Sequence, residues 1–297
     1  MNRADVVIIG AGPAGIATAI QLKRYKIEPE LLEQEEIGGL LRNAHWVENY
    51  PGFPEGISGL ALVGLFKKQL EKTGIRVHSE KVLELDYQDG LFLTKTDCRE
   101  ITSLVTVIAT GTKSKKMAAP PIPTEVECHF FYEVHPLLGI QNKIIAIIGG
   151  GDAAFDYACS LAQRNRVIIL NRSAHAKCVP ALQERTAKSG NVEYMCDTRI
   201  RTITRADSRV LLMCARNHEQ EELRVEADDV VVAIGREASL DFVSPELRES
   251  FGHLRSAQRL HLVGDVNNGI YRQTAISIGD GLRAAMEIHK NIASHRI

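Results

Sequence analysis

Two glycine-rich segments of the sequence have the composition of turns that bind phosphates. One reads Gly10-Ala11-Gly12-Pro13-Ala14-Gly15 and the other reads Gly149-Gly150-Gly151-Asp152-Ala153-Ala154. In a turn without side chains, backbone N–H groups can approach a pyrophosphate closely, and the following helix points its positive end at the same phosphates. Alanine at the last position still allows a helix to pack closely on its strand. Each segment therefore predicts a dinucleotide site.

The residue about 20 positions beyond each turn indicates which dinucleotide the turn takes. After the first turn this residue is Glu33, whose carboxylate suits the hydroxyls of an adenosine ribose. After the second turn it is Asn171, and Arg172 and Lys177 follow. Two cations without an acid favour a 2′-phosphate, so we expect NADPH rather than NADH at the second turn.

A strand before each turn and a helix after it must position the glycines. The segments 5–9 and 143–148 each begin with a charged residue and continue as an apolar run, which is typical of strands buried on both faces of a parallel sheet. Apolar residues then recur at helical spacing, over 16–22 in the first copy and to about Arg164 in the second. A further strand is expected over 167–170. The sequence thus predicts an α/β fold in which one strand–turn–helix design is used twice.

The remaining segments indicate how the chain divides into domains. Residues 112–123 combine several charges with three prolines, a composition that predicts a linker. A second crossing between domains is expected near Gly235. After a strand that ends at Gly264, a terminal helix from about Thr274 to Ile292 is expected to return to the first domain.

Composition argues against several classes of protein. Hydrophobic residues make up 44% and charged residues 25% of the 297 residues, which is typical of a globular chain. A net charge of −1 gives no sign of a nucleic-acid binder. No apolar run approaches the roughly 18 residues of a membrane span, and the first residues do not read as a secretory signal. We therefore expect no nucleic-acid or membrane partner.

The six cysteines and ten histidines are scattered along the chain. The sequence contains no Cys-x-x-Cys pair and no histidine spacing typical of metal ligands. We expect reduced thiols, a cytoplasmic protein and no metal site.

Two dinucleotide sites on one chain predict an electron path from a transient nicotinamide to a resident flavin. Further segments fit a flavin: the loop 37–41, the strand end 107–111, the pair Gly264-Asp265, and 272–274 at the start of the last helix. The positive end of that helix suits the negative charge of a reduced flavin ring. Each segment alone reads as a simple turn, and their order along one chain supports the flavin.

Taken together, these segments resemble the low-molecular-weight thioredoxin reductase family of flavoproteins. The resemblance runs from Val6 to Ala285 and includes Glu48–Gly59 (ENYPGFPEGISG) and Val232–Gly235 (VAIG). It implies two Rossmann-like dinucleotide-binding domains, each a three-layer ββα sandwich, in a homodimer. The FAD domain, residues 1–115 and 238–297, would be split around an inserted NADPH domain, residues 120–236.

The turns and the resemblance together predict the residues at each cofactor. Those expected at FAD are Gly10, Gly12, Pro13, Ala14, Gly15, Glu33, Gln34, Gly39, Leu40, Leu41, Asn49, Val82, Ala109, Thr110, Gly111, Gly264, Asp265, Arg272, Gln273 and Thr274. Those expected at NADPH are Gly149, Gly151, Asp152, Ala153, Ala154, Asn171, Arg172, Lys177, Ile234 and Gly235.

The chain departs from the family where the family carries its redox-active dithiol. Counted back from Gly149 without gaps, the two cysteine positions fall on Tyr132 and His135, and Cys128 is a lone thiol. Leu40 stands where the family usually has glutamine, and Ser173 replaces the second of its paired arginines. The ferredoxin/flavodoxin–NADP reductases of the same fold also lack the dithiol.

These features predict an FAD-dependent enzyme that passes electrons from NADPH to an acceptor without a protein dithiol. The expected acceptor is a small molecule or a small redox protein such as a ferredoxin or flavodoxin. His135 and Tyr132 are candidate proton donors near the flavin, and the alternative is that they only fill the space of the dithiol. Two other interpretations stay open: a flavin- or nucleotide-binding sensor without turnover, and a flavoprotein that uses an external thiol partner.

Overall fold

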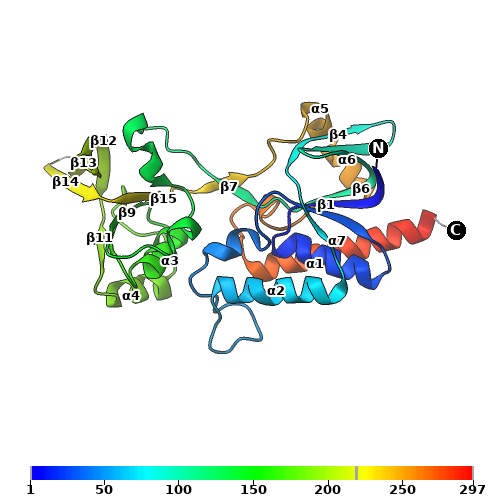
Figure 1. Cartoon of the computed structure of the whole chain (residues 1–297), viewed down its shortest axis with the longest axis horizontal. Coiled ribbons are helices and arrows are strands. Elements are labelled where there is room, and N and C mark those ends of the chain that lie inside the picture. The colour runs from blue at the N-terminus through cyan, green and yellow to red at the C-terminus, as the bar shows by residue number, and fades with distance from the viewer. Residues whose placement is uncertain (1, 218–219, 296–297) are drawn as a thin grey trace. The chain divides into compact units, whose positions relative to one another are not determined.

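The computed structural model describes residues 2–217 and 220–295, and the chain divides into two compact units (Figure 1). The first unit contains the chain up to Arg42, Val47–Lys113, and the chain from Glu237 onward. The second unit contains Asn43–Trp46 and Ser114–Arg236. Across the described residues, no helix has the length and apolar character that a bilayer span requires.

The first unit is built on a mainly parallel sheet. Its strand order is β3-β2-β1-β6-β5-β4, and β17 pairs with the second half of β6. The pairs β4–β5 and β5–β6 are antiparallel, and the other pairs of the sheet are parallel. The strands are β1 (Asn2–Ile9), β2 (Pro29–Glu33), β3 (Val77–Ser79), β4 (Val82–Gln88), β5 (Leu91–Thr96), β6 (Glu100–Ile108) and β17 (Leu260–Leu262).

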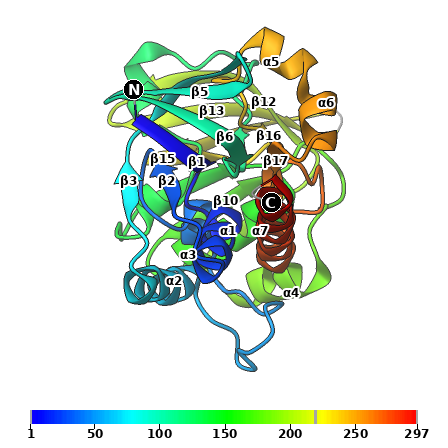
Figure 2. The same ribbon diagram turned by 90° about the vertical axis from the view of Figure 1, so that its right-hand side faces the viewer.

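Helices cover one face of this sheet, and α1 and α7 lie side by side in both views (Figures 1 and 2). α1 begins with a proline at its first position, and α2 begins at Gly59 after Ser58, whose hydroxyl accepts a hydrogen bond from the Ala61 N–H. The helices of this unit are α1 (Pro13–Arg24), α2 (Gly59–Thr73), α5 (Pro245–Glu249), α6 (Phe251–Ser256) and α7 (Thr274–His295), with 3-10 turns η1 (Gly39–Asn43) and η4 (Gly264–Val266).

The β4–β5 hairpin, although β5 is paired with β6 in the same sheet, packs over the opposite face of β1 together with α5 and α6. Val7 and Ile9 of β1 belong to a buried cluster with Leu85, Phe92 and Leu247. Because successive side chains of a strand point to opposite faces, Val6 and Ile8 face the helices instead. All four residues are at most 4% exposed, which explains the continuous apolar run in the sequence.

The second unit repeats the plan with a parallel sheet of strand order β11-β10-β9-β15-β8. The antiparallel sheet β12-β13-β14 packs on one face, and α3 and α4 pack on the other. Its strands are β8 (Phe130–Phe131), β9 (Ile144–Ile148), β10 (Arg166–Leu170), β11 (Val192–Met195), β12 (Thr198–Ala206), β13 (Arg209–Arg216), β14 (Glu221–Ala227) and β15 (Asp229–Val232). Its helices are α3 (Asp152–Leu161) and α4 (Pro180–Lys188), with 3-10 turns η2 (Thr124–His129) and η3 (His135–Leu137).

The structure confirms the predicted α/β class with two Rossmann-like, three-layer units. Elements differ from the prediction mainly at their ends: α3 stops at Leu161 rather than near Arg164, and α7 continues to His295. The predicted linker is not wholly irregular, because β7 (Thr112–Ser114) pairs with β16 (Arg236–Ala238).

Close packing of α1 on α7 depends on one glycine. A Cβ at Gly281 would lie 2.3 Å from the Ala14 carbonyl oxygen, whereas a Cβ at Gly279 of the same helix would meet nothing within 4 Å. We predict that G281A lowers the free energy of unfolding by about 1–3 kcal/mol or more because the helices must separate. G279A should instead raise it by up to about 1 kcal/mol, because alanine favours a helix. Denaturant unfolding of both variants checks this, and equal effects would contradict the packing argument.

Candidate functional site

The first glycine turn is shaped by two close backbone contacts at the end of β1. Gly10 has φ +105°, and its N–H donates to the Leu32 carbonyl at 2.8 Å. A Cβ at Gly10 would lie 2.6 Å from the Ala109 carbonyl oxygen, and one at Gly15 would lie 1.9 Å from the Gly10 carbonyl oxygen. These two glycines therefore let strand ends and helix come together.

Gly12 has a different role from Gly10 and Gly15. It caps α1 with φ −75°, no side chain caps the helix start, and a Cβ there would meet nothing within 4 Å. The turn thus presents bare backbone and the positive end of a helix to open space, an arrangement that fits a pyrophosphate.

Glu33 lies at the edge of this turn. Its carboxylate accepts hydrogen bonds from the backbone N–H of Ala11 at 2.7 Å and of Glu35 at 3.0 Å. These bonds place an acid beside the turn, where the ribose of a bound adenine dinucleotide is expected.

Two more of the predicted FAD segments pack directly on the turn. The Gly38 N–H donates to the Ala11 carbonyl at 2.9 Å, and a Cβ at Gly39 would lie 3.3 Å from the Gly12 Cα. On the other side, the Ala109 N–H donates to the Ile9 carbonyl at 2.8 Å. Thr110 and Gly111 follow Ala109 at the end of β6.

The C-terminal segment adds polar groups to the same edge of the sheet. A Cβ at Gly264 would lie 2.9 Å from the Ala14 Cβ, so this turn touches the start of α1. The Ser277 hydroxyl, buried on α7, donates to the Asp265 carboxylate at 3.1 Å. Just before α7, the Gln273 side chain accepts a hydrogen bond from the Asn49 amide at 2.7 Å, so two predicted residues that are distant in the sequence lie together.

Some predicted FAD residues lie less close to the turn. The Gln34 side chain is exposed, and Val82 pairs with Thr96 at the start of β4. Leu41 is buried, while Leu40 is partly exposed. Their roles remain predictions.

The second glycine turn repeats the main backbone contacts of the first. The Gly149 N–H donates to Leu170 at 3.0 Å, and the Ala233 N–H donates to Ile148 at 2.8 Å. A Cβ at Gly149 would lie 2.3 Å from the Ala233 carbonyl oxygen, and one at Gly151 would meet nothing within 4 Å. This turn therefore fits a second pyrophosphate by the same physical argument.

The loop that carries the predicted cations lies against this turn. The Lys177 N–H donates to the Gly150 carbonyl at 2.6 Å, and the side chains of Arg172 and Lys177 are exposed. The Asp152 carboxylate accepts the Val179 N–H at 2.8 Å and so fixes the end of the loop. Among the other predicted NADPH residues, Ala154 is buried, and Ile234, 42% exposed, and Gly235 follow β15.

A polar cluster occupies the segment where the family carries its dithiol. The Glu133 carboxylate contacts Arg236 and Asn43 at 2.6 and 2.7 Å and accepts the Ser114 hydroxyl at 2.9 Å. Burial raises the pKa of Tyr157, so its hydroxyl stays protonated and donates to Glu133 at 3.5 Å. Residue spacing does not indicate this role for Glu133, because its partners come from distant segments.

Tyr132 and His135 flank this cluster. The Lys116 ammonium lies 3.7 Å from the centre of the Tyr132 ring, and the Tyr132 hydroxyl contacts the Met117 N–H at 3.4 Å. The backbone N–H of His135 donates to the Asn43 side chain at 3.1 Å. These contacts anchor the segment, and a role for either side chain in proton transfer remains a prediction.

Asp156 is a half-buried carboxylate of α3 that residue spacing also does not indicate. It accepts the backbone N–H of His45 at 2.8 Å. Burial raises the pKa of Asp156 to about 6, against the opposing effects of the His45 N–H, Arg185 and the Trp46 N–H.

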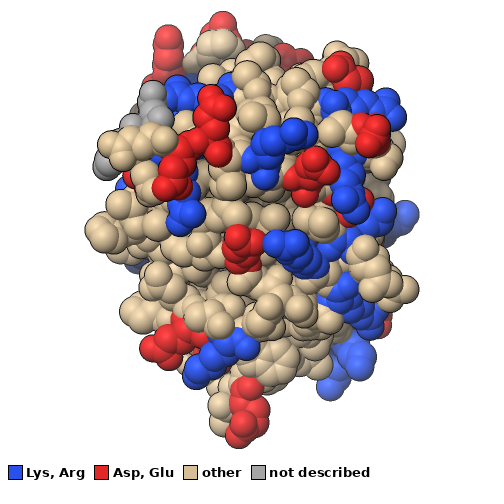
Figure 3. Space-filling view, turned by 90° about the vertical axis from the view of Figure 1, so that its left-hand side faces the viewer, with Lys and Arg blue, Asp and Glu red and all other residues tan. Residues whose placement is uncertain are grey.

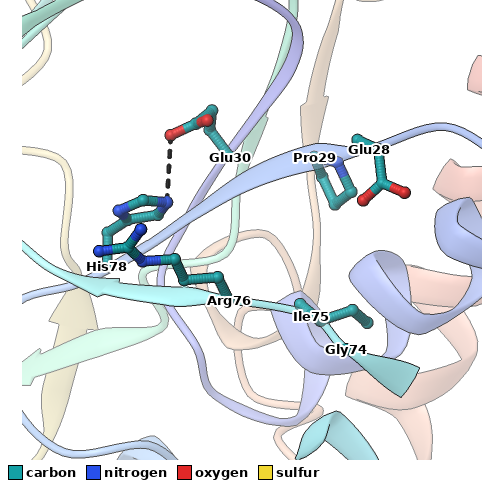
Figure 4. Close-up of a pocket in the computed structure, with 7 residues that line it drawn as sticks. All are labelled: Glu28, Pro29, Glu30, Gly74, Ile75, Arg76 and His78. Atoms are coloured by element: carbon teal, nitrogen blue, oxygen red, sulfur yellow. Dashed lines mark ion pairs between the residues drawn. The ribbon is translucent and has the colours of Figure 1, made fainter.

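A separate cavity lies in the first unit, lined by the start of β2 and the chain from Gly74 to His78 (Figure 4). Its volume is about 250 Å³. His78 lies 3.3 Å from the Glu30 carboxylate, which is also paired with Arg99 at 2.8 Å. The glycine turn adjoins the carboxyl end of β2, whereas this cavity lies at its amino end, so these charges tie strands together away from the turn.

Among the residues that the structure describes, the cysteines and the side chains able to bind a metal do not gather into one site. The six cysteines are all free. Over residues 2–217 and 220–295, no group of three or more His, Cys, Asp or Glu side chains is placed to hold a metal ion. Burial raises the pKa of Cys159, Cys178 and, to about 11, Cys214, which disfavours the reactive thiolate.

Gly12 and Gly15 of the first turn allow a matched test. We predict that G12A folds normally but binds FAD about tenfold or more weakly, because its methyl group projects where the ligand is expected. G15A should lose about 3 kcal/mol of stability through its clash with Gly10. Flavin retained after gel filtration and the melting temperature separate the two effects. Normal flavin content in G12A would contradict the placement of the pyrophosphate.

Asp156 predicts a pH-dependent change in stability. Its pKa is higher in the folded than in the unfolded chain, so folding is favoured as pH falls through about 6, and the ionised carboxylate destabilises the fold above it. D156N removes this ionisation. The difference in unfolding free energy between variant and wild type should therefore shift in favour of the variant by about 1–3 kcal/mol from about pH 4 to about pH 8. A difference that stays constant with pH in denaturant melts would contradict the burial of this carboxylate.

Comparison with known proteins identifies relatives over nearly the whole chain. Thioredoxin reductase 1 of Saccharomyces cerevisiae is 29% identical over 97% of this chain and 98% of its own length. A 34.2 kDa protein in a rubredoxin operon of Clostridium pasteurianum is 28% identical over 97% of both chains. The crystal structure of Lactococcus lactis thioredoxin reductase matches with a TM-score of 0.87 and 26% identity, over 98% of this chain and 99% of that one. Bacillithiol disulfide reductase from Staphylococcus aureus shares the fold at 17% identity, with a TM-score of 0.76 over the full length of both chains.

A family model described as pyridine nucleotide-disulphide oxidoreductase matches residues 4–275, which span both glycine turns. Thioredoxin reductase-like members of this family use FAD and NADPH, and the bare backbone at Gly12 and Gly151 fits two such dinucleotides. The chain is thus an FAD-dependent, thioredoxin reductase-like enzyme that belongs to the pyridine nucleotide-disulphide oxidoreductase family.

Proposed function

We propose that this enzyme takes electrons from NADPH and passes them from FAD directly to an external acceptor, without an internal dithiol. The observation that carries the proposal is the segment Tyr132–His135. A reductase of protein disulfides that works through its own thiols needs one thiol to attack and one to resolve. In this chain, the two positions that correspond to the cysteines of the family hold Tyr132 and His135.

The contacts of this segment support a fixed structural element rather than a mobile redox group. Val134 is 0% exposed, and Glu133 is bonded to Arg236, Ser114 and Asn43. Cys128 is exposed and has no second cysteine near it in the sequence. These features support a structural role for the segment rather than a role in disulfide exchange.

The chain's own residues would hold and orient the two cofactors. Gly12 and Gly151 would admit the pyrophosphates, Glu33 would bind a ribose, and Asp265, held by Ser277, would accept from flavin hydroxyls. The start of α7 at Thr274 would stabilise negative charge on the flavin ring. When bound, FAD supplies a group that accepts hydride from NADPH and can release electrons one at a time.

Arg172 and Lys177 support NADPH over NADH, because both side chains are exposed on the loop beside the second turn. A guanidinium and an ammonium there suit a 2′-phosphate.

The acceptor in this proposal is a small redox protein of the ferredoxin or flavodoxin type, or a small quinone-like molecule. The C. pasteurianum relative, named for a rubredoxin operon, favours testing small redox proteins first. On the face drawn in Figure 3, basic side chains are more frequent toward the right, and acidic side chains are spread between them and over the rest of the face. The family resemblance supports a homodimer, and the scattered free cysteines support a reducing compartment such as the cytoplasm.

The decisive experiment is an anaerobic titration of the purified flavoprotein with NADPH, and separately with NADH, followed by the flavin absorbance band. We expect rapid bleaching by NADPH at about one equivalent per flavin and much slower bleaching by NADH. Flavin that is present but not bleached by either nucleotide would overturn the proposal and favour the sensor.

Acceptors are then added to the reduced enzyme. Oxidised ferredoxin or flavodoxin should restore the flavin band. Rapid reduction of thioredoxin by the enzyme alone would contradict the absence of a working dithiol. C128S distinguishes the external-thiol alternative: disulfide-linked activity that is lost in this variant would show that Cys128 takes part.

A further inference from the structure

The two glycine turns differ at one equivalent position. Leu32 and Leu170 accept the hydrogen bonds from Gly10 and Gly149, so the residues that follow them, Glu33 and Asn171, correspond. Glu33 directs its carboxylate to the turn. Asn171 occupies the corresponding position beside the second turn, and its uncharged side chain forms its hydrogen bonds with other groups.

The polar atoms of Asn171 are used inside the protein. Its amide N–H groups donate to the His175 carbonyl at 3.1 Å and to the Tyr194 hydroxyl at 2.9 Å, and its side-chain oxygen accepts the Ser173 N–H at 3.1 Å. Asn171 is also only 5% exposed. Its side chain therefore shapes the loop, and the contact with a nucleotide that the sequence predicts for it stays a prediction.

The loop from Asn171 to Lys177 is fastened to the glycine turn at both ends. A Cβ at Gly150 would lie 2.4 Å from the Asn171 Cγ, so the asparagine lies directly against the turn. At the other end, the Lys177 N–H donates to the Gly150 carbonyl. Gly150 thus contacts both ends of the loop.

Tyr194 links this loop to the body of the unit. It belongs to β11 and pairs with Ile169 of β10. Its ring contacts the ring of Phe155, with centroids 5.4 Å apart, and Phe155 is the fourth residue of α3, the helix that follows the glycines. A strand and a helix therefore fix the position of the Tyr194 ring, and with it the position of the hydroxyl that accepts the hydrogen bond from Asn171.

We propose that Asn171 and Tyr194 are positioning residues that set the selectivity for a 2′-phosphate. They hold the loop so that the side chains of Arg172 and Lys177 stay beside the turn where the adenosine ribose is expected. Ionic contacts fall off with distance and with loop motion, so a loosened loop loses the phosphate contacts but leaves the pyrophosphate site intact. The inference rests on the proposed preference for NADPH.

The test measures equilibrium binding by calorimetry, with adenosine 2′,5′-bisphosphate and AMP as probes. Y194F removes one hydroxyl and keeps the ring. It should weaken binding of the bisphosphate about fivefold, and N171A about tenfold or more, while AMP affinity changes less than about twofold. R172A serves as a positive control that removes a phosphate contact directly.

Asn165 provides a matched control at the other end of β10. It is also 5% exposed, its amide donates to the Ile140 and Leu161 carbonyls, and its oxygen accepts the Lys143 N–H. N165A should therefore cost stability as N171A does and leave the ratio of the two affinities unchanged. If N171A does not fold, Y194F alone decides.

The outcomes separate the two proposals. Equal affinity of the wild type for both probes would contradict the preference for NADPH itself. A wild type that prefers the bisphosphate, with Y194F unchanged or with N171A and N165A altering the ratio alike, would overturn only the positioning role. A selective loss in N171A and Y194F supports it.

Discussion

The arrangement of both sites depends on how closely the backbone approaches itself beside each turn. At Gly10 and at Gly149, the position of a Cβ falls within 2.6 Å of a carbonyl oxygen on the neighbouring strand end. Because these contacts are backbone against backbone, no side-chain movement can relieve them. The glycines let Ala109 and Ala233 close in, and this closeness places a helix start, a bare turn and an adjacent loop within reach of one elongated ligand.

The same design then diverges through one side chain. Glu33, the last residue of β2, accepts a hydrogen bond from the first turn, whereas Asn171, directly after β10, donates to its own loop. A carboxylate would repel a phosphate at that place, and an amide would not. The change from acid to amide thus does two things: it removes a repulsive charge and it orders the segment that carries the cations.

Local patterns predicted the strands, turns and helices well, because the signals for them lie within about ten residues. The apolar run before Gly10 and the cations after Asn171 are of this kind. Glu133 and Asp156 could not be found in this way, since their partners come from distant parts of the sequence, such as Asn43, His45 and Arg236. Nor does spacing reveal that Asn171 is buried, because its partner Tyr194 lies on another strand.

The short piece Asn43–Trp46 belongs to the second unit although the chain on both sides of it belongs to the first. Its Asn43 amide and His45 N–H serve two carboxylates of that unit, Glu133 and Asp156. A fragment limited to residues 114–236 would lose both donors, and carboxylates deprived of such bonds are costly to keep buried. Grafting this nucleotide-binding module onto another flavoprotein would therefore require transplanting a four-residue peptide that is remote in the sequence.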